Sequence, residues 1–189
     1  MARKGNIVEQ YLEAGISDRI DIILNNYRDF PGLIDGFEDT LKWLIISEKR
    51  YNRTASRGSL GIRVSSTKCS DPTADAAIEN QETLDAIRGN GDLERVLQNT
   101  DCPERHRREA CLLMDMREDY ELVSAQIRTL PGSEREDIQK YLSGIMDIAL
   151  MTEERCCTDS SARNRICIIR RHIKERAGLV LERKYSRRQ

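Results

Sequence analysis

The stretch "TDSSARNRICIIRRHIKERAG", residues 158–178, combines a narrow apolar pattern with clusters of basic side chains. At about 100° of rotation per residue, one face of a helix would collect four apolar side chains: Ala162, Ile166, Ile169 and Ile173. Thr158 or Asp159 is placed to cap its start, and Ala177-Gly178 to end it after about Arg176. The stretch therefore predicts an amphipathic helix that isoleucines hold against the rest of the protein.

The composition favours an all-α fold. The chain has 189 residues, enough for one sizeable domain or two small ones. It is 39% hydrophobic and 33% charged, with two Phe, one Trp and four Pro, which leaves little material for a β-sandwich or barrel. Helices with narrow apolar stripes and charged outer faces suit this composition. We predict a multi-helix bundle with a C-terminal helix-turn-helix.

Breaks in the helical pattern divide the chain into four predicted segments. These are an N-terminal helical segment (1–51), a linker or loop (52–72), a central helical region (73–131) and a helix-turn-helix DNA-binding domain with a basic tail (132–189). Within the first segment Gly15 predicts a break, and ahead of the third Ser70 or Asp71 is placed to cap a helix with Pro72 in its first turn. Within the last, Ser133 and Glu136 have the spacing of a capping box, and Gly144 is placed to end that helix.

Charge is distributed unevenly along the chain. Residues 163–189 contain ten Lys or Arg and two Glu, a net charge of +8, whereas residues 1–162 carry a net charge of −9. An acidic body with a basic end indicates a polyanionic partner for that end. The alternative is a solvated tail that only keeps the protein soluble.

Several classes of protein are disfavoured by the sequence. No apolar run approaches the roughly 18–20 residues that span a bilayer, and the start of the chain lacks the apolar core of a signal peptide, so we expect no membrane association and a cytoplasmic protein with reduced cysteines. The six cysteines form no C-x-x-C pair, and the two histidines, His106 and His172, have no nucleophile at an informative spacing. We therefore expect no metal, no cofactor and no enzymatic activity.

The outward side of the 158–178 helix has the composition of a DNA-reading surface. It collects Ser160, Arg163, Asn164, Cys167, Arg171 and Lys174. In the major groove Arg pairs with guanine and Asn with adenine through two hydrogen bonds each, and later basic residues can reach phosphates. The alternative is a surface helix whose arginines pair with the acidic body.

The residues that surround this helix resemble a known family. The segment "LPGSEREDIQKYLSGIMDIALMTEERCCTDSSARNRICIIRRHIKERAG" (130–178) resembles the region-4 helix-turn-helix of bacterial sigma factors. Leu130-Pro131 and the acidic residues after it match the opening of that motif, residues 141–144 match the end of its first helix, and residues 158–166 match its turn and reading helix. Upstream, "LGIRVSSTKCSDPTADAAIEN" (60–80) resembles sigma-like transcriptional regulators of Firmicute phages and prophages, the ArpU-type group.

Two features depart from the sigma pattern. Cys156-Cys157 occupies the turn where glycine is usual, and about one extra residue follows Gly144. The N-terminal helices also do not resemble the sigma region that opens the −10 element. The resemblance thus implies a regulator with a sigma-like DNA-binding end rather than a complete promoter-melting factor.

We expect ten residues of the reading helix to bind DNA. We expect Thr158 at the start of the helix and five side chains near bases: Ser160, Ser161, Arg163, Asn164 and Arg165. We expect four side chains near phosphates: Arg170, Arg171, Lys174 and Arg176. The expected partners are double-stranded DNA and, through the acidic body, RNA polymerase or a second copy of the chain.

A second hypothesis belongs to a different class. A phage DNA-packaging adaptor, such as a small terminase subunit, also combines a helix-turn-helix with a helical assembly segment. The helix expected over 104–130 would then be the oligomerisation face. A closed ring of many copies would favour packaging, whereas a monomer or dimer would favour transcription.

Overall fold

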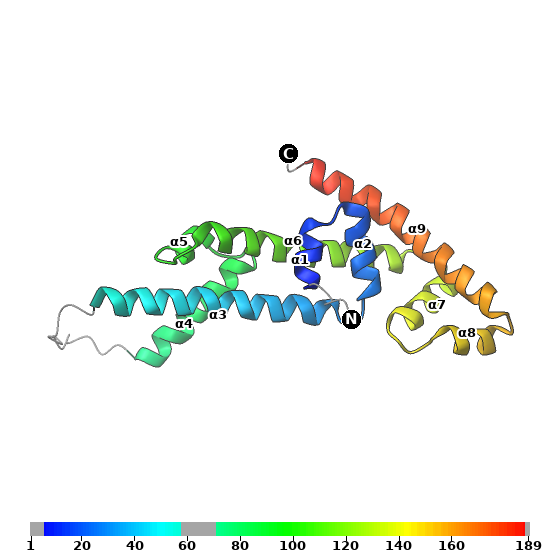
Figure 1. Ribbon diagram of the computed structural model, residues 1–189, viewed down its shortest axis with the longest axis horizontal. Helices are drawn as coiled ribbons and strands as arrows, with labels where there is room; N and C mark the ends of the chain where they lie inside the picture. Colours follow the sequence, from blue (N-terminus) through cyan, green and yellow to red (C-terminus); the bar gives the residue numbers. More distant parts are fainter. Residues whose placement is uncertain (1–5, 58–70, 188–189) are drawn as a thin grey trace. The chain divides into compact units, whose positions relative to one another are not determined.

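The computed structural model describes residues 6–57 and 71–187. Every regular element among these residues is an α-helix, which confirms the predicted all-α class (Figure 1). The helices are α1 (Ile7–Glu13), α2 (Ile16–Asn25), α3 (Phe30–Arg57), α4 (Pro72–Ile87), α5 (Leu93–Leu97), α6 (Pro103–Arg128), α7 (Gly132–Leu142), α8 (Ile148–Arg155) and α9 (Asp159–Ser186).

The described residues fall into two compact units. The terminal unit joins the two ends of the chain, Met1–Gly32 and Arg117–Gln189, and the central unit comprises Leu33–Met116. The division cuts through α3 and α6, so both helices contribute residues to each unit. The segments predicted from the sequence follow chain order instead, because a pattern read along the chain does not show which distant segments pack together.

The terminal unit is organised around one buried carboxylate. Asp119 on α6 is fully buried, and its oxygens accept hydrogen bonds from the hydroxyl of Tyr11 at 2.6 Å, the hydroxyl of Tyr185 at 2.8 Å and the ammonium of Lys184 at 2.6 Å. The guanidinium of Arg19 lies 3.9 Å from the same carboxylate. A buried charge is tolerated when it is paired and hydrogen-bonded, so this carboxylate joins α1, α2 and α6 to the end of α9.

Aromatic and aliphatic side chains complete the core of the terminal unit. The ring centroids of Tyr11 and Phe30 lie 5.9 Å apart, and those of Phe30 and Tyr120 lie 5.7 Å apart in a stacked arrangement. From α2 and α9 the core receives Ile20, Ile23, Leu24, Ala177 and Leu181. In Figure 1 α2 lies along the later turns of α9, which brings the second and last helices of the chain together.

Two polar pairs, each with one buried side chain, connect the helices of the central unit. Glu38 on α3 is only 4% exposed and accepts hydrogen bonds from the guanidinium of Arg88, at the end of α4, over 2.7–3.2 Å. His106 on α6 is buried, and its Nε2 lies 2.9 Å from a carboxylate oxygen of Glu48 on α3. The apolar core between these helices consists of Leu41, Ile45, Ile87, Val96, Leu97, Ala110, Leu113 and Met116.

Several local predictions are confirmed. The helical pattern breaks at Gly15, where α1 gives way to α2. Asp71 caps α4 by accepting a hydrogen bond from the amide of Thr73, and Pro72 stands in the first turn, where its missing N–H costs nothing. Gly144 follows the end of α7 with a φ of 71°, a conformation that glycine adopts freely.

Three local predictions are wrong. The linker or loop expected over 52–72 is wrong at both described ends, because α3 continues to Arg57 and α4 begins at Pro72. Residues 58–70 lie outside the described residues, as does about half of the 60–80 segment that resembles the phage regulators. The capping box at Ser133 does not form, because α7 already begins at Gly132, after Pro131, and has no side-chain cap. The helix expected to end at Ala177-Gly178 continues to Ser186.

The continuation of α9 has a physical cause. A glycine in a helix interior costs about 1 kcal/mol relative to alanine. Beyond Gly178, however, Leu181 is fully buried and Lys184 reaches Asp119. Burying one leucine side chain contributes about 1.5–3 kcal/mol, so packing outweighs the weak local signal to stop.

Removal of the buried carboxylate should strongly destabilise the protein. We expect Asp119→Ala to lower the free energy of unfolding by about 3–5 kcal/mol, because Lys184 and the Tyr11 hydroxyl lose their buried acceptor. Denaturant unfolding of the full chain measures this. The neighbouring Glu118→Ala removes a half-exposed carboxylate 2.9 Å from the same ammonium and should cost less than about 1 kcal/mol. Equal losses in the two variants would contradict the role given to Asp119.

Alkaline pH should destabilise the protein through the Tyr11 hydroxyl in the same cluster. Burial raises the pKa of the Tyr11 hydroxyl well above its ordinary value of 10.0, and the negative charge of Asp119 raises it further. Since the folded-state pKa exceeds the unfolded one, this contribution to stability is complete below pH 10 and is lost as the pH rises further, at up to about 1.4 kcal/mol per pH unit.

Tyr11→Phe tests that dependence. The variant should be less stable at pH 8, where it lacks the hydrogen bond to Asp119, yet should lose less stability than the wild type between pH 10 and pH 11. Tyr51→Phe is the matched control, because Tyr51 is 72% exposed, and it should keep the wild-type pH dependence. An unchanged slope in Tyr11→Phe would show that other groups cause the alkaline loss.

Candidate nucleic-acid interface

The predicted DNA-reading segment folds as three helices with defined ends. Asp147 caps α8 by accepting a hydrogen bond from the amide of Leu150 at 2.8 Å, and Thr158 caps α9 by accepting one from the amide of Ser161 at 3.3 Å. Only residues 156–158 separate α8 from α9. Cys156 ends α8 in the left-handed conformation, with a φ of 48°. It thus occupies a position that favours glycine, at a cost of about 1–2 kcal/mol for a residue with a Cβ.

A buried carboxylate also fastens these three helices to one another. Asp137 on α7 is only 1% exposed. One of its oxygens accepts from Nη2 of Arg155 on α8 at 2.5 Å, and the other accepts from Nε of Arg165 on α9 at 2.6 Å. The hydrogen bond to Asp137 raises the pKa of Arg155. Beneath this pair lie the apolar side chains Ile138, Leu142, Met146, Met151, Ala162, Ile166 and Ile169, including the predicted isoleucine stripe of α9.

The first two turns of α9 carry an exposed polar surface, which we call the reading face. It consists of Ser160, Ser161, Arg163 and Asn164, all exposed. Neither Arg163 nor Asn164 makes a side-chain hydrogen bond or ion pair to any other part of the described chain. These two side chains are therefore available to a ligand without the loss of an internal contact.

The structure separates the other predicted contact residues into two groups. Arg165 pairs with Asp137, so its Nε is occupied by an internal contact. Arg170 donates a hydrogen bond to the side-chain oxygen of Asn25, and Lys174 forms an ion pair with Asp21, both partners lying on α2. Arg171 and Arg176 are exposed and have no side-chain partner among the described residues.

The sequence patterns did not indicate the groups that hold these cations. Asp137, Asp21 and Asn25 belong to no recognised motif. Asp137 directly precedes the inward-facing Ile138, which was the one signal that it lies near the buried side of its helix. The contacts themselves join residues 18 to 153 positions apart, beyond the reach of any local pattern.

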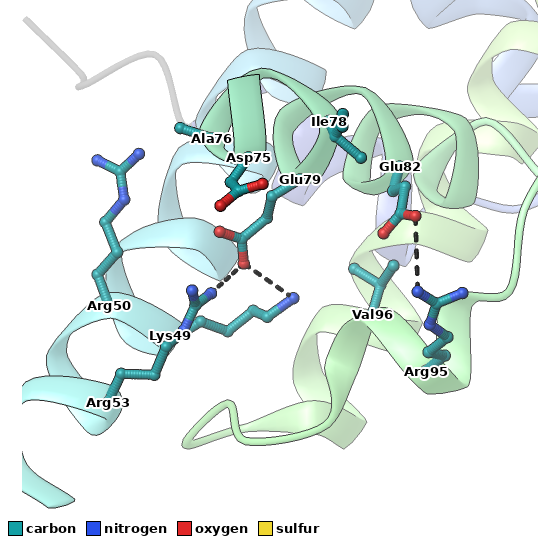
Figure 2. A pocket seen from close by; sticks show the side chains of 10 residues that line it. All are labelled: Lys49, Arg50, Arg53, Asp75, Ala76, Ile78, Glu79, Glu82, Arg95 and Val96. Carbon is teal, nitrogen blue, oxygen red and sulfur yellow. Dashed lines mark hydrogen bonds and ion pairs between the residues drawn. The ribbon is translucent and has the colours of Figure 1, made fainter. Parts of the chain in front are cut away.

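A polar hollow lies on the central unit, between α3, α4 and α5 (Figure 2). It encloses about 670 Å³, and most of its cations are matched within the protein: Glu79 accepts from Arg53 and lies 3.3 Å from Lys49, while Glu82 lies 3.5 Å from Arg95. Burial alone would raise the pKa of Glu79, but the hydrogen bond to Arg53 and the charges of Arg53 and Lys49 together lower it. The hollow is therefore an ion-paired surface rather than an open anion site.

The described residues contain neither a metal-binding cluster nor a membrane-spanning helix. Among the described residues no group of three or more His, Cys, Asp or Glu side chains is arranged to hold a metal ion. None of the described helices combines the length and apolar character needed to cross a membrane. No protein-family model, curated protein or solved structure matches this chain.

The role of Asp137 can be measured directly. Asp137→Ala should lower the free energy of unfolding by about 2–3 kcal/mol, because it removes two hydrogen bonds to charged groups but leaves both arginines partly exposed to water. The adjacent Glu136→Ala, which removes only an exposed pair with Lys140, should change it by less than about 1 kcal/mol. Denaturant unfolding compares the two variants. If Asp137→Ala loses no more unfolding free energy than Glu136→Ala, Asp137 does not join the three helices as described.

Proposed function

We propose that the protein is a sequence-specific DNA-binding transcription regulator of the phage or prophage type. In this proposal α8, residues 156–158 and α9 form a helix-turn-helix, and α9 is the helix that enters the major groove. The observation that carries the proposal is the reading face, where an exposed, unpaired Arg163 and Asn164 follow a capped helix start. Arg and Asn are the side chains that discriminate guanine and adenine with paired hydrogen bonds.

The connection between the helices supports the same proposal. Helix-turn-helix motifs join two helices through a turn of three or four residues, and the N-terminal residues of the second helix contact base edges. Here three residues separate α8 from α9, and the exposed polar side chains lie at the start of α9. The resemblance of residues 130–178 to sigma region 4 adds to this argument.

The internal contacts narrow the set of DNA-contacting residues. Direct base contacts are assigned to Ser160, Ser161, Arg163 and Asn164, and phosphate contacts to Arg171 and Arg176. Arg165, Arg170 and Lys174 serve first as structural residues, because phosphate would have to compete with Asp137, Asn25 and Asp21 for them. The acidic remainder of the chain would bind RNA polymerase or a second copy, and the protein would act in the cytoplasm without a cofactor.

A selection experiment tests the proposal. Duplexes bound by the full chain are selected from a random pool at about 0.15 M salt, since the phosphate contribution depends on salt. The wild type should enrich one sequence. Arg163→Ala with Asn164→Ala should weaken binding to that sequence by about 2–5 kcal/mol, because each bidentate contact contributes about 1–3 kcal/mol of discrimination.

The control is a matched pair of changes at the far end of α9. Arg183→Ala with Ser186→Ala also removes an exposed arginine and a small polar side chain, and should leave the selected sequence unchanged. The full chain is required, because residues 132–189 alone would expose Ala177 and Leu181 and lose the Asp119 contacts. If the protein forms a large ring and enriches no sequence, the packaging hypothesis is supported instead.

A further inference from the structure

An apolar groove runs between α2 and α9 in the terminal unit. It encloses about 330 Å³, and the lining residues that matter here are Ile16 and Ile20 from α2 and Glu175, Gly178, Leu179 and Glu182 from α9. Leu179 is 60% exposed, which is unusual for a leucine beside other apolar side chains. Glu175 and Glu182 are exposed at the groove and have no ion-pair partner among the described residues. Lys174 also lines the groove, but its ammonium pairs with Asp21. The groove is therefore apolar with two unpaired negative charges.

Gly178 has no role within its own chain that requires a glycine. It lies in the interior of α9 without a positive φ, and a Cβ added there would meet no atom within 4 Å. Alanine would stabilise such a helix by about 1 kcal/mol. Since Gly178 lines the groove, its missing side chain leaves room for an atom from outside.

The central unit presents a complementary surface around an exposed tryptophan. Trp43 on α3 is 66% exposed and borders a hollow of about 510 Å³ whose lining contains Lys42 and Arg50 and no acidic residue. Arg50 has no side-chain partner among the described residues, and Figure 2 shows no interaction between it and the Glu79 cluster. Among the described residues Lys42 pairs only with Asp39, whose side chain is 72% exposed, so a partner's carboxylate can replace that contact.

From these two surfaces we infer that the protein self-associates head to tail: Trp43 of one copy inserts beside Gly178 in the α2–α9 groove of a second copy. Lys42 and Arg50 are eight residues apart, about 12 Å along α3, and Glu175 and Glu182 are seven apart, about 10 Å along α9. Two cations thus face two anions at similar spacing, with an apolar side chain between them. The contact does not depend on DNA binding.

The negative charges of the groove favour the Trp43 surface of another copy over nucleic acid. Phosphates would be repelled by Glu175 and Glu182, whereas the basic, tryptophan-bearing surface of another copy is attracted. Trp and Arg are the residues that most often carry the energy of protein interfaces. Because the two surfaces differ, the contact is heterologous, and repetition builds a ring where the rotation closes and a filament where it does not. Enrichment of one DNA sequence, rather than the size of the assembly alone, then separates the proposed regulator from the packaging hypothesis.

Reversing the charges on each of the two surfaces tests the inference. The mass of the full chain is measured by light scattering over a series of concentrations without DNA. The wild type should gain mass with concentration, and Trp43→Ala should weaken association about 30-fold or more. Lys42→Glu with Arg50→Glu should be monomeric, as should Glu175→Lys with Glu182→Lys, because each double variant places like charges on both surfaces. Leu12→Ala, at an exposed leucine outside both surfaces, is the control and should associate like the wild type.

Mixing the two double variants is the decisive measurement. In the mixture, the acidic Trp43 surface of one variant faces the basic groove of the other, and their two unchanged surfaces also carry opposite charges. Association should therefore return. All the changed side chains lie on the surface or at its edge, and circular dichroism confirms that the variants are folded. A wild type that stays monomeric, double variants that still associate, or a mixture that stays monomeric would each overturn the inference. Loss of DNA binding in Trp43→Ala with unchanged mass would assign that surface to nucleic acid instead.

Discussion

The buried carboxylate of Asp119 is the constraint on which the terminal unit depends. An ionised group with no exposure to water is costly unless nearby donors replace its hydration, and here the donors come from Tyr11, Lys184 and Tyr185. These partners belong to the first and last helices of the chain. Folding of the unit therefore requires both ends of the chain to meet the middle of α6, and this places α2 along the second half of α9.

That placement decides which cations of α9 are available. Formal charge assigns +8 to residues 163–189, but Lys174 and Lys184 pair with Asp21 and Asp119, and Arg165 pairs with Asp137. What remains at the start of the helix is the reading face, and beyond it the unpaired Arg171 and Arg176. Net charge along a segment therefore overstates the positive surface that a polyanion would meet, because part of it is compensated inside the fold.

The sequence predicted what depends on local periodicity. The isoleucine stripe of α9, the Thr158 cap and the left-handed Gly144 follow from spacing and from single-residue preferences. The failures lie where long-range packing overrides a local signal: Gly178 predicts a helix end, yet Leu181 and Lys184 keep the helix intact. The partners of Arg165, Arg170 and Lys174 could not be predicted, because a single Asp or Asn has no pattern that shows whether it faces solvent or a distant helix.

The two proposed surfaces of α9 are compatible because of its length. Gly178 follows Asn164 by fourteen residues, about 21 Å along the helix, so a second copy docked in the α2–α9 groove would leave the first two turns uncovered. Successive copies joined through this groove would each present a reading face. Once one copy is bound to DNA, its neighbours are held at a high local concentration, and even weak base contacts would then give tight overall binding if the spacing of the copies matches the helical repeat of DNA. Self-association would thus raise the affinity for DNA without strengthening any single contact to a base.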